Sequence, residues 1–181
     1  MNINLFYPFH YTCIIPISYL QYIASISKTT IPIEWQIILM NEGSFTQNLS
    51  YLNDQNIYIT MQQKLYDKTA SDHVTTLRCV WLENTIYTKL TFARSLWQII
   101  PQDNLYQKLN ESQPIGNLLI ANKADIYKNI IELYYGYCIN LEKYFHSNVA
   151  IWGRKYILYY NNDNYAIIQE FFSPRISVFF T

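Results

Sequence analysis

Apolar and polar positions alternate through much of the chain in a way that predicts paired β-strands. Residues 57–61 alternate with a period of two, and two further apolar runs, 74–84 and 85–97, meet near Glu83-Asn84. Towards the C-terminus, the runs 154–160 and 165–172 flank four turn-forming residues. We therefore expect one strand followed by two antiparallel hairpins.

The region before these strands has the spacing of short helices. Thr30 is expected to cap a helix that has Pro32 near its first helical position and that ends at Asn41-Glu42-Gly43. Ser44 is expected to cap a second helix over residues 45–52. Between the hairpins, we expect a short helix at 104–109 and a tight turn at 114–116.

Two segments are less distinct. Residues 124–145 fit either a helix or a long strand, and their Tyr and Ile content favours the strand. Residues 1–30 are apolar but interrupted by Pro8 and Pro16, have no Lys or Arg before Lys28, and lack a run of 18 apolar residues. We expect no membrane span, an N-terminal segment 1–30 that packs on the domain, and a single α+β domain over 31–181.

Composition narrows the functional classes. Half of the 181 residues are hydrophobic and 14% are charged, which excludes a disordered chain. Thirteen basic residues balance thirteen acidic ones, so the basic surplus of a nucleic-acid binder is missing. Three cysteines and three histidines are scattered without metal-ligand spacing. We expect no nucleic-acid partner, no metal, no disulfide framework and a reducing compartment.

The residue usage indicates an AT-rich genome. There are 18 tyrosines but only four glycines, and Ile and Asn are abundant, as codons rich in A and T would produce. Under such pressure the scarce residue types are the informative ones. They are the arginines Arg78, Arg94, Arg154 and Arg175 and the glycines Gly43, Gly116, Gly136 and Gly153.

Charges within apolar strands are the main candidates for chemistry, because four dispersed glycines cannot form a phosphate-binding loop. Arg78 and Glu170 each lie in the middle of a predicted strand. Strand alternation allows them to face solvent, or to line a cavity as a carboxylate receptor and an acid/base or hydroxyl anchor. For Arg94 and Arg154 we expect structural ion pairs.

Several motifs, in this order, resemble the chorismate pyruvate-lyase family, and in particular its plastid-encoded and cyanobacterial-type members. They are NEGSFTQNL, RCVWL, FAR, PIG, WGR and QEFF-SP, which together extend from about Ile31 to Pro174. The resemblance implies an α+β domain whose antiparallel sheet and helical flaps enclose an internal ligand cavity. It also implies an enzyme that splits chorismate into 4-hydroxybenzoate and pyruvate, for quinone biosynthesis, without a cofactor.

The resemblance assigns four site residues. Arg78 would hold the ring carboxylate, and Glu170 would contact the hydroxyl side of the ring. Backbone amides of Ile115, in PIG, and of Phe45 would complete the ring site. Since Glu170 lies in an apolar strand, we expect its pKa to be raised, which would make it a general acid.

The resemblance leaves one alternative function open. A non-catalytic module of the same fold would bind small aromatic acids, as the effector-sensing domains of some transcription regulators do. We expect a monomer with chorismate as its small-molecule partner. It would reside in the plastid stroma, or in the cytoplasm of a bacterium with an AT-rich genome.

Overall fold

The computed structural model describes residues 8–24, 31–53, 56–68, 74–84, 88–99, 126–160 and 163–180. Seven strands form one sheet: β1 (His10–Pro16), β2 (Tyr58–Lys68), β3 (Val74–Glu83), β4 (Lys89–Ile99), β5 (Ile126–Tyr137), β6 (Ile151–Tyr160) and β7 (Asp163–Phe172). The helices are α1 (Ile17–Ala24), α2 (Ile33–Leu39), α3 (Phe45–Asn53), α6 (Ile139–Phe145) and the 3₁₀ helix η1 (Pro174–Phe180).

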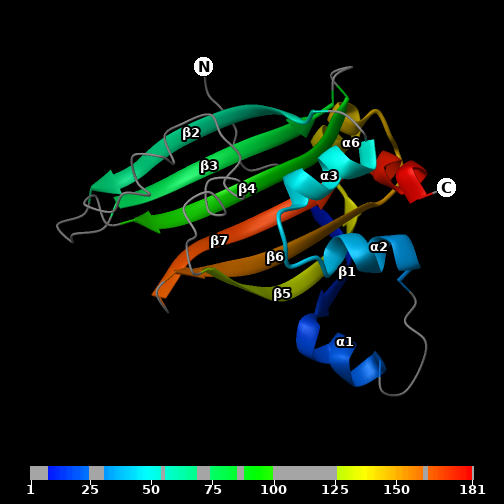
Figure 1. Cartoon of the computed structure of the whole chain (residues 1–181), viewed down its shortest axis with the longest axis horizontal. Coiled ribbons are helices and arrows are strands. Elements are labelled where there is room, and N and C mark those ends of the chain that lie inside the picture. Colours follow the sequence, from blue (N-terminus) through cyan, green and yellow to red (C-terminus); the bar gives the residue numbers. More distant parts are fainter. Residues whose placement is uncertain are drawn as a thin grey trace.

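Every pair of neighbouring strands in the described part of the sheet is antiparallel, and the strand order is β1-β5-β6-β7-β4-β3-β2 (Figure 1). The predicted α+β class with a mostly antiparallel sheet is confirmed. Both hairpins are also confirmed, since β3 pairs with β4 and β6 pairs with β7. The first ends in a turn closed by the Asn84 amide, which donates to the carbonyl of Thr88.

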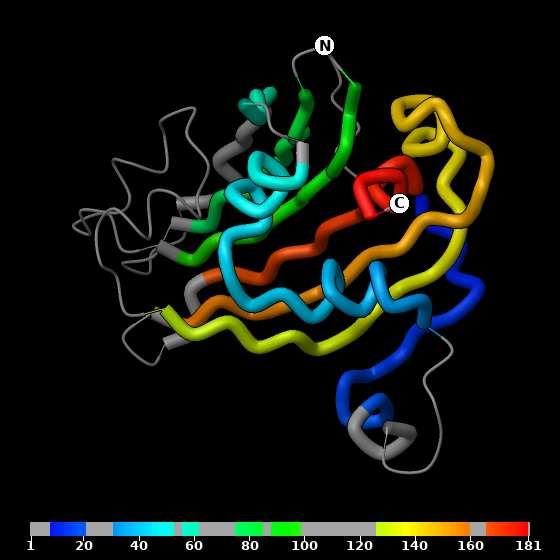
Figure 2. The backbone as a smooth tube through the Cα atoms, turned by 45° about the vertical axis from the view of Figure 1, so that its right-hand side comes forward, coloured from blue at the N-terminus to red at the C-terminus, as the bar shows by residue number. Residues whose placement is uncertain are grey.

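Successive side chains of a strand point to opposite faces, and apolar side chains cover both faces of this sheet. On one face, α2, α3 and η1 pack over Leu133, Tyr156 and Phe172, and Figure 2 shows these helices lying across the strands. On the other face, α6 packs against Phe92 and Phe171. The central strands are therefore buried on both sides, which explains why charged side chains in them need partners.

The helices differ from expectation in detail. Helix α2 begins after Pro32, which takes the N-cap position and makes no side-chain capping bond, whereas Thr30 was the predicted cap. Proline supplies no cap hydroxyl, but its fixed φ suits the helix start. The second predicted cap is confirmed, because Ser44 Oγ accepts a bond from the Gln47 amide at 3.4 Å. Thr30, the helix at 104–109 and the turn at 114–116 lie outside the described residues.

The ambiguous run 124–145 is divided between two elements. Its first part is strand β5, as favoured, but residues 139–145 form helix α6, which the expectation of a single long strand missed. The change occurs at Cys138, whose amide donates to the Glu142 carboxylate at 2.9 Å. His146, with a positive φ of 50°, ends the helix.

Strand β1 is an unexpected addition to the sheet. The N-terminal segment carried no strand signal, yet His10–Pro16 pairs with β5 and forms one edge of the sheet. The register shifts between Tyr11 and Cys13. Edge strands need only one neighbour, so a short, proline-bounded segment can occupy this place.

Gly153 on β6 leaves no room for a side chain beside β7. A Cβ at this position would lie 2.6 Å from the carbonyl oxygen of Glu170 and 3.0 Å from the ring of Phe171. The Gly153→Ala variant should therefore lose about 1–3 kcal/mol of unfolding free energy, because backbone in a central strand cannot move away. Urea unfolding measures this loss.

Gly43→Ala is the matched control. A Cβ on Gly43 would meet only the Asn41 side chain, at 3.7 Å, so its stability should stay within about 1 kcal/mol of the wild type. Equal losses in the two variants would contradict the close approach at Gly153.

Candidate functional site

Arg78 and Glu170 lie on the same face of the sheet. Arg78 on β3 is opposite Ser95 on β4, which is opposite Ile168 on β7, and Glu170 is two residues beyond Ile168. Residues two apart in a strand share a face. Two strand spacings and a two-residue offset place the two Cα atoms about 12 Å apart. Side chains extending from these positions can contact opposite ends of a ring-sized molecule.

The strand between them carries small side chains on this face. Ala93 is opposite Glu170 and Ser95 is opposite Arg78, so β4 contributes only a methyl and a hydroxymethyl group to the space between the two charges. Ala93 and its β3 neighbour Val80 are only half-buried, although both lie in central strands. Ala93 and Val80 therefore keep part of their surface exposed between the strand positions of Arg78 and Glu170.

Arg78 is almost fully removed from water, with 1% of its surface exposed. Its Nε donates to Met61 Sδ at 2.7 Å, and its backbone carbonyl accepts a bond from Ser95 Oγ at 3.3 Å. Burial lowers the pKa of the Arg78 guanidinium to about 10. A carboxylate beside this desolvated cation would form a charge-assisted hydrogen bond with it.

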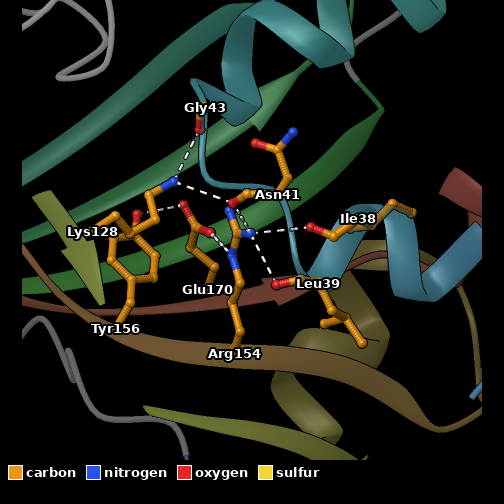
Figure 3. Close-up of polar contacts among 8 residues, drawn as sticks. All are labelled: Ile38, Leu39, Asn41, Gly43, Lys128, Arg154, Tyr156 and Glu170. Atoms are coloured by element: carbon orange, nitrogen blue, oxygen red, sulfur yellow. Dashed lines mark hydrogen bonds and ion pairs between the residues drawn. The ribbon is translucent and has the colours of Figure 1, made fainter. Parts of the chain in front are cut away.

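Glu170 is buried and held by two donors. Arg154 Nε donates to its Oε2 at 2.7 Å, and the Tyr156 hydroxyl donates to its Oε1 at 3.0 Å (Figure 3). Burial by itself would raise the pKa of Glu170, but Arg154, Lys128 and the two hydrogen bonds outweigh it and lower this pKa. The expected raised pKa is therefore wrong. The residue is a carboxylate, able to accept hydrogen bonds.

Arg154 connects this carboxylate to the end of helix α2. Its side chain is fully buried, and Nη1 donates to the carbonyls of Ile38, Leu39 and Asn41 at 3.1, 3.1 and 2.8 Å. The last carbonyls of a helix lack partners within the helix, so a buried cation satisfies them. The predicted ion pair of Arg154 is confirmed. Arg94, on the opposite face, donates to Gln169 at 2.6 Å.

Lys128 on β5 joins the same cluster. Its Nζ donates to the carbonyls of Gly43 at 2.9 Å and Asn41 at 3.5 Å, and it lies 4.8 Å from the centre of the Tyr156 ring. Burial, reinforced by nearby Arg154, lowers the pKa of Lys128 to about 8, even though Glu170 and Glu42 act in the other direction. Figure 3 shows Lys128 and Arg154 reaching the same connection between α2 and α3.

Phe45 is brought to this cluster, as the first residue of α3. Its ring is buried against Phe172, with ring centres 4.8 Å apart, and lies 5.8 Å from the Arg154 guanidinium carbon. The first amides of a helix have no partner within the helix, and the Phe45 amide is one of them. Ile115, the fourth predicted site residue, lies outside the described residues.

Sequence reasoning missed Lys128 and Tyr156. Lys128 carried the same signal that singled out Arg78 and Glu170, a charge within an apolar strand, but it was read only as part of an ambiguous run. Tyr156 is one of 18 tyrosines and had no distinguishing signal. Its role comes from register, since β6 places it two residues from Arg154 and thus on the same face.

Other kinds of site find no support within the described residues. No group of three His, Cys, Asp or Glu side chains in that part of the chain could hold a metal ion. None of the helices described there has the length and apolar character needed to cross a membrane. Cys79 and Cys138 are buried free thiols, and Cys13 is an exposed one.

Comparison with known proteins finds a matching family and several similar relatives. The sequence matches the family described as "Chorismate pyruvate-lyase Rv2949c-like" over residues 39–180. It is 45% identical to the uncharacterized protein ycf21 of Antithamnion sp., over 82% of this chain and 83% of that protein. The ycf21 protein of Porphyra purpurea is 36% identical, over 83% and 86% of the two chains. Such relatives are plastid-encoded proteins of algae.

The C-terminal domain of Yurk from Bacillus subtilis aligns with a TM-score of 0.42 and 11% sequence identity, covering 64% of this chain and 88% of that one.

Proposed function

The chain belongs to the Rv2949c-like chorismate pyruvate-lyase family, and we propose that it is itself a chorismate pyruvate-lyase. It eliminates pyruvate from chorismate and forms 4-hydroxybenzoate, a precursor for quinone biosynthesis. The observation that carries this proposal is the placement of Arg78 and Glu170 on one face of the sheet, about 12 Å apart at Cα, with only small side chains of β4 between them.

In this proposal, the two charges bind opposite ends of the ring. Arg78 pairs with the ring carboxylate, as its planar, desolvated guanidinium favours. The Glu170 carboxylate has used one acceptor position on each oxygen, for Arg154 and for Tyr156, and retains further lone pairs for the ring hydroxyl. The backbone amides of Phe45 and Ile115 complete the ring site.

The chemistry is a β-elimination that makes the ring aromatic. The proton on the hydroxyl-bearing ring carbon is removed, the neighbouring carbon–oxygen ether bond breaks, and enolpyruvate leaves and takes up a proton to become pyruvate. The reaction is neither an oxidation nor a reduction, so we propose no cofactor. Because Glu170 is ionised and lies on the hydroxyl side, it is assigned as the base that accepts the ring proton.

The setting follows from the relatives. Their plastid-encoded origin supports a place in the plastid stroma, where 4-hydroxybenzoate would enter quinone synthesis. We propose that residues 31–181 form the catalytic domain, that residues 1–30 pack on it, and that the chain acts as a monomer.

Replacing Arg78 tests the carboxylate end of the site. The Arg78→Ala variant should bind 4-hydroxybenzoate about 10–150-fold more weakly, because a charge-assisted hydrogen bond contributes roughly 1.5–3 kcal/mol. Isothermal titration calorimetry measures the dissociation constant, and circular dichroism checks the fold.

Arg94→Ala is the control, since Arg94 lies on the next strand but on the opposite face, over the Phe171 ring. It should bind 4-hydroxybenzoate like the wild type. Unchanged affinity in a folded Arg78→Ala variant would remove Arg78 from the site. Binding alone is also expected of a non-catalytic aromatic-acid module, so turnover of chorismate decides between the two functions.

A further inference from the structure

Two cations on neighbouring strands of the sheet hold the connection between α2 and α3 through its backbone carbonyls. Lys128 of β5 donates to the carbonyls of Asn41 and Gly43, and Arg154 of β6 donates to Asn41 and to the last turn of α2. The Asn41 carbonyl thus accepts bonds from both. Strands remote in sequence thereby determine the path of a segment that contributes Phe45 to the site.

Holding the loop through Lys128 costs desolvation free energy. Lys128 is half-buried, so its ammonium has lost water, whereas loop carbonyls at a surface are ordinarily satisfied by solvent. An apolar side chain of similar length would pack against the Tyr156 ring without this cost. The Lys128 ammonium therefore serves to hold the carbonyl of Gly43, two residues before Phe45, and not to improve packing.

The same cluster extends to the candidate base. The Lys128 ammonium lies over the ring of Tyr156, the Tyr156 hydroxyl binds Glu170, and Glu170 binds Arg154. Arg154 then returns to Asn41. These contacts form a closed ring in which Arg154 donates both to the Asn41 carbonyl and to the Glu170 carboxylate, so a shift of the loop also shifts the surroundings of Glu170.

We propose that Lys128 is a positioning residue, which holds the Asn41–Gly43 connection against the sheet and so directs the Phe45 amide towards the ligand. The role in ligand binding rests on the proposed function. The loop contact itself does not, because the hydrogen bonds of Lys128 define it without reference to any ligand.

The first experiment measures the loop without ligand. Hydrogen exchange of the full chain, followed by mass spectrometry of peptides within 38–53, should be about tenfold faster in Lys128→Met than in the wild type. Lys128→Arg, which keeps charge and donors, should restore slow exchange. Lys155→Met is the control, since Lys155 faces the other side of the sheet, beside Glu132 at 3.7 Å, and should change nothing.

The second experiment connects the loop to binding. Lys128→Met should bind 4-hydroxybenzoate about tenfold more weakly and raise KM for chorismate by a similar factor, with a smaller change in kcat, as expected for one misplaced hydrogen-bond donor. Lys128→Arg should recover most of both losses.

The outcomes separate the two proposals. If exchange in Lys128→Met equals that in Lys155→Met, Lys128 does not hold the connection and the inference is overturned. If exchange rises but affinity and KM stay at wild-type values, the connection does not position a ligand group, which also overturns it. If the wild type binds no 4-hydroxybenzoate, the proposed function fails, and the exchange contrast still decides whether Lys128 holds the loop.

Discussion

The Glu170→Gln variant should turn over chorismate with a kcat about 10²–10⁴-fold below that of the wild type. Glutamine keeps the size of the side chain and one acceptor oxygen, but its amide cannot accept the ring proton. The carboxylate state of Glu170 follows from its contacts with Arg154 and Tyr156, which lower its pKa despite its burial. Steady-state release of 4-hydroxybenzoate measures the effect.

Glu132→Gln provides the comparison for this loss. Glu132 is also in a central strand, but its side chain is 30% exposed and its nearest cation is Lys155 at 3.7 Å. Its removal should leave kcat unchanged. A loss near tenfold in Glu170→Gln would mean that Glu170 only accepts the hydroxyl hydrogen bond, and wild-type turnover would exclude both roles.

The Arg154→Met variant should lose about 3–5 kcal/mol of unfolding free energy. Arg154 is fully buried, and its removal leaves the Glu170 carboxylate without its ion-pair partner and the three carbonyls at the end of α2 without their shared donor. Breaking a buried pair from one side costs far more than the pair contributes as a whole. Urea unfolding at neutral pH measures the difference.

Lys155→Met is the control, because it removes a partly exposed positive charge from the same strand, β6. Lys155 is the next residue, but its side chain is 31% exposed and faces the opposite side, so its loss should cost about 0–1 kcal/mol. A double variant, Arg154→Met with Glu170→Met, should recover part of the stability, because the Glu170 carboxylate is then no longer left buried without its ion-pair partner. Equal losses of unfolding free energy in Arg154→Met and Lys155→Met would contradict the burial of Arg154.

The sheet was largely predictable because local signals sufficed for its central strands. The strand pairs β3–β4 and β6–β7 combine period-two alternation with nearby turn residues, and a hairpin needs no more information than that. Strand β1 pairs with residues more than a hundred positions away, and nothing in its own sequence specifies that partner. Helix α6 had a local signal, Glu142 reaching back to Cys138, but the dense tyrosine and isoleucine content obscured it.

The sequence was enough to select the charged residues Arg78 and Glu170, but not to predict the hydrogen bonds and ion pairs of the candidate site. Arg78 and Glu170 were selected because buried charges within apolar strands require a reason, and the register places them on one face. The protonation expected for Glu170 was wrong, because burial was considered without Arg154. Arg154 bonds Asn41 across 113 positions and Lys128 bonds Gly43 across 85, and such pairs follow only from the fold.

Incubation of the purified chain with chorismate, with both products measured in the same sample, tests directly whether the chain is a chorismate pyruvate-lyase. Chromatography quantifies 4-hydroxybenzoate, and lactate dehydrogenase with NADH quantifies pyruvate. The two products should form in equal amounts, and Glu170→Gln should form them at least a hundredfold more slowly. A folded wild type that binds 4-hydroxybenzoate but releases neither product from chorismate would contradict the claim and identify the chain as a binding module.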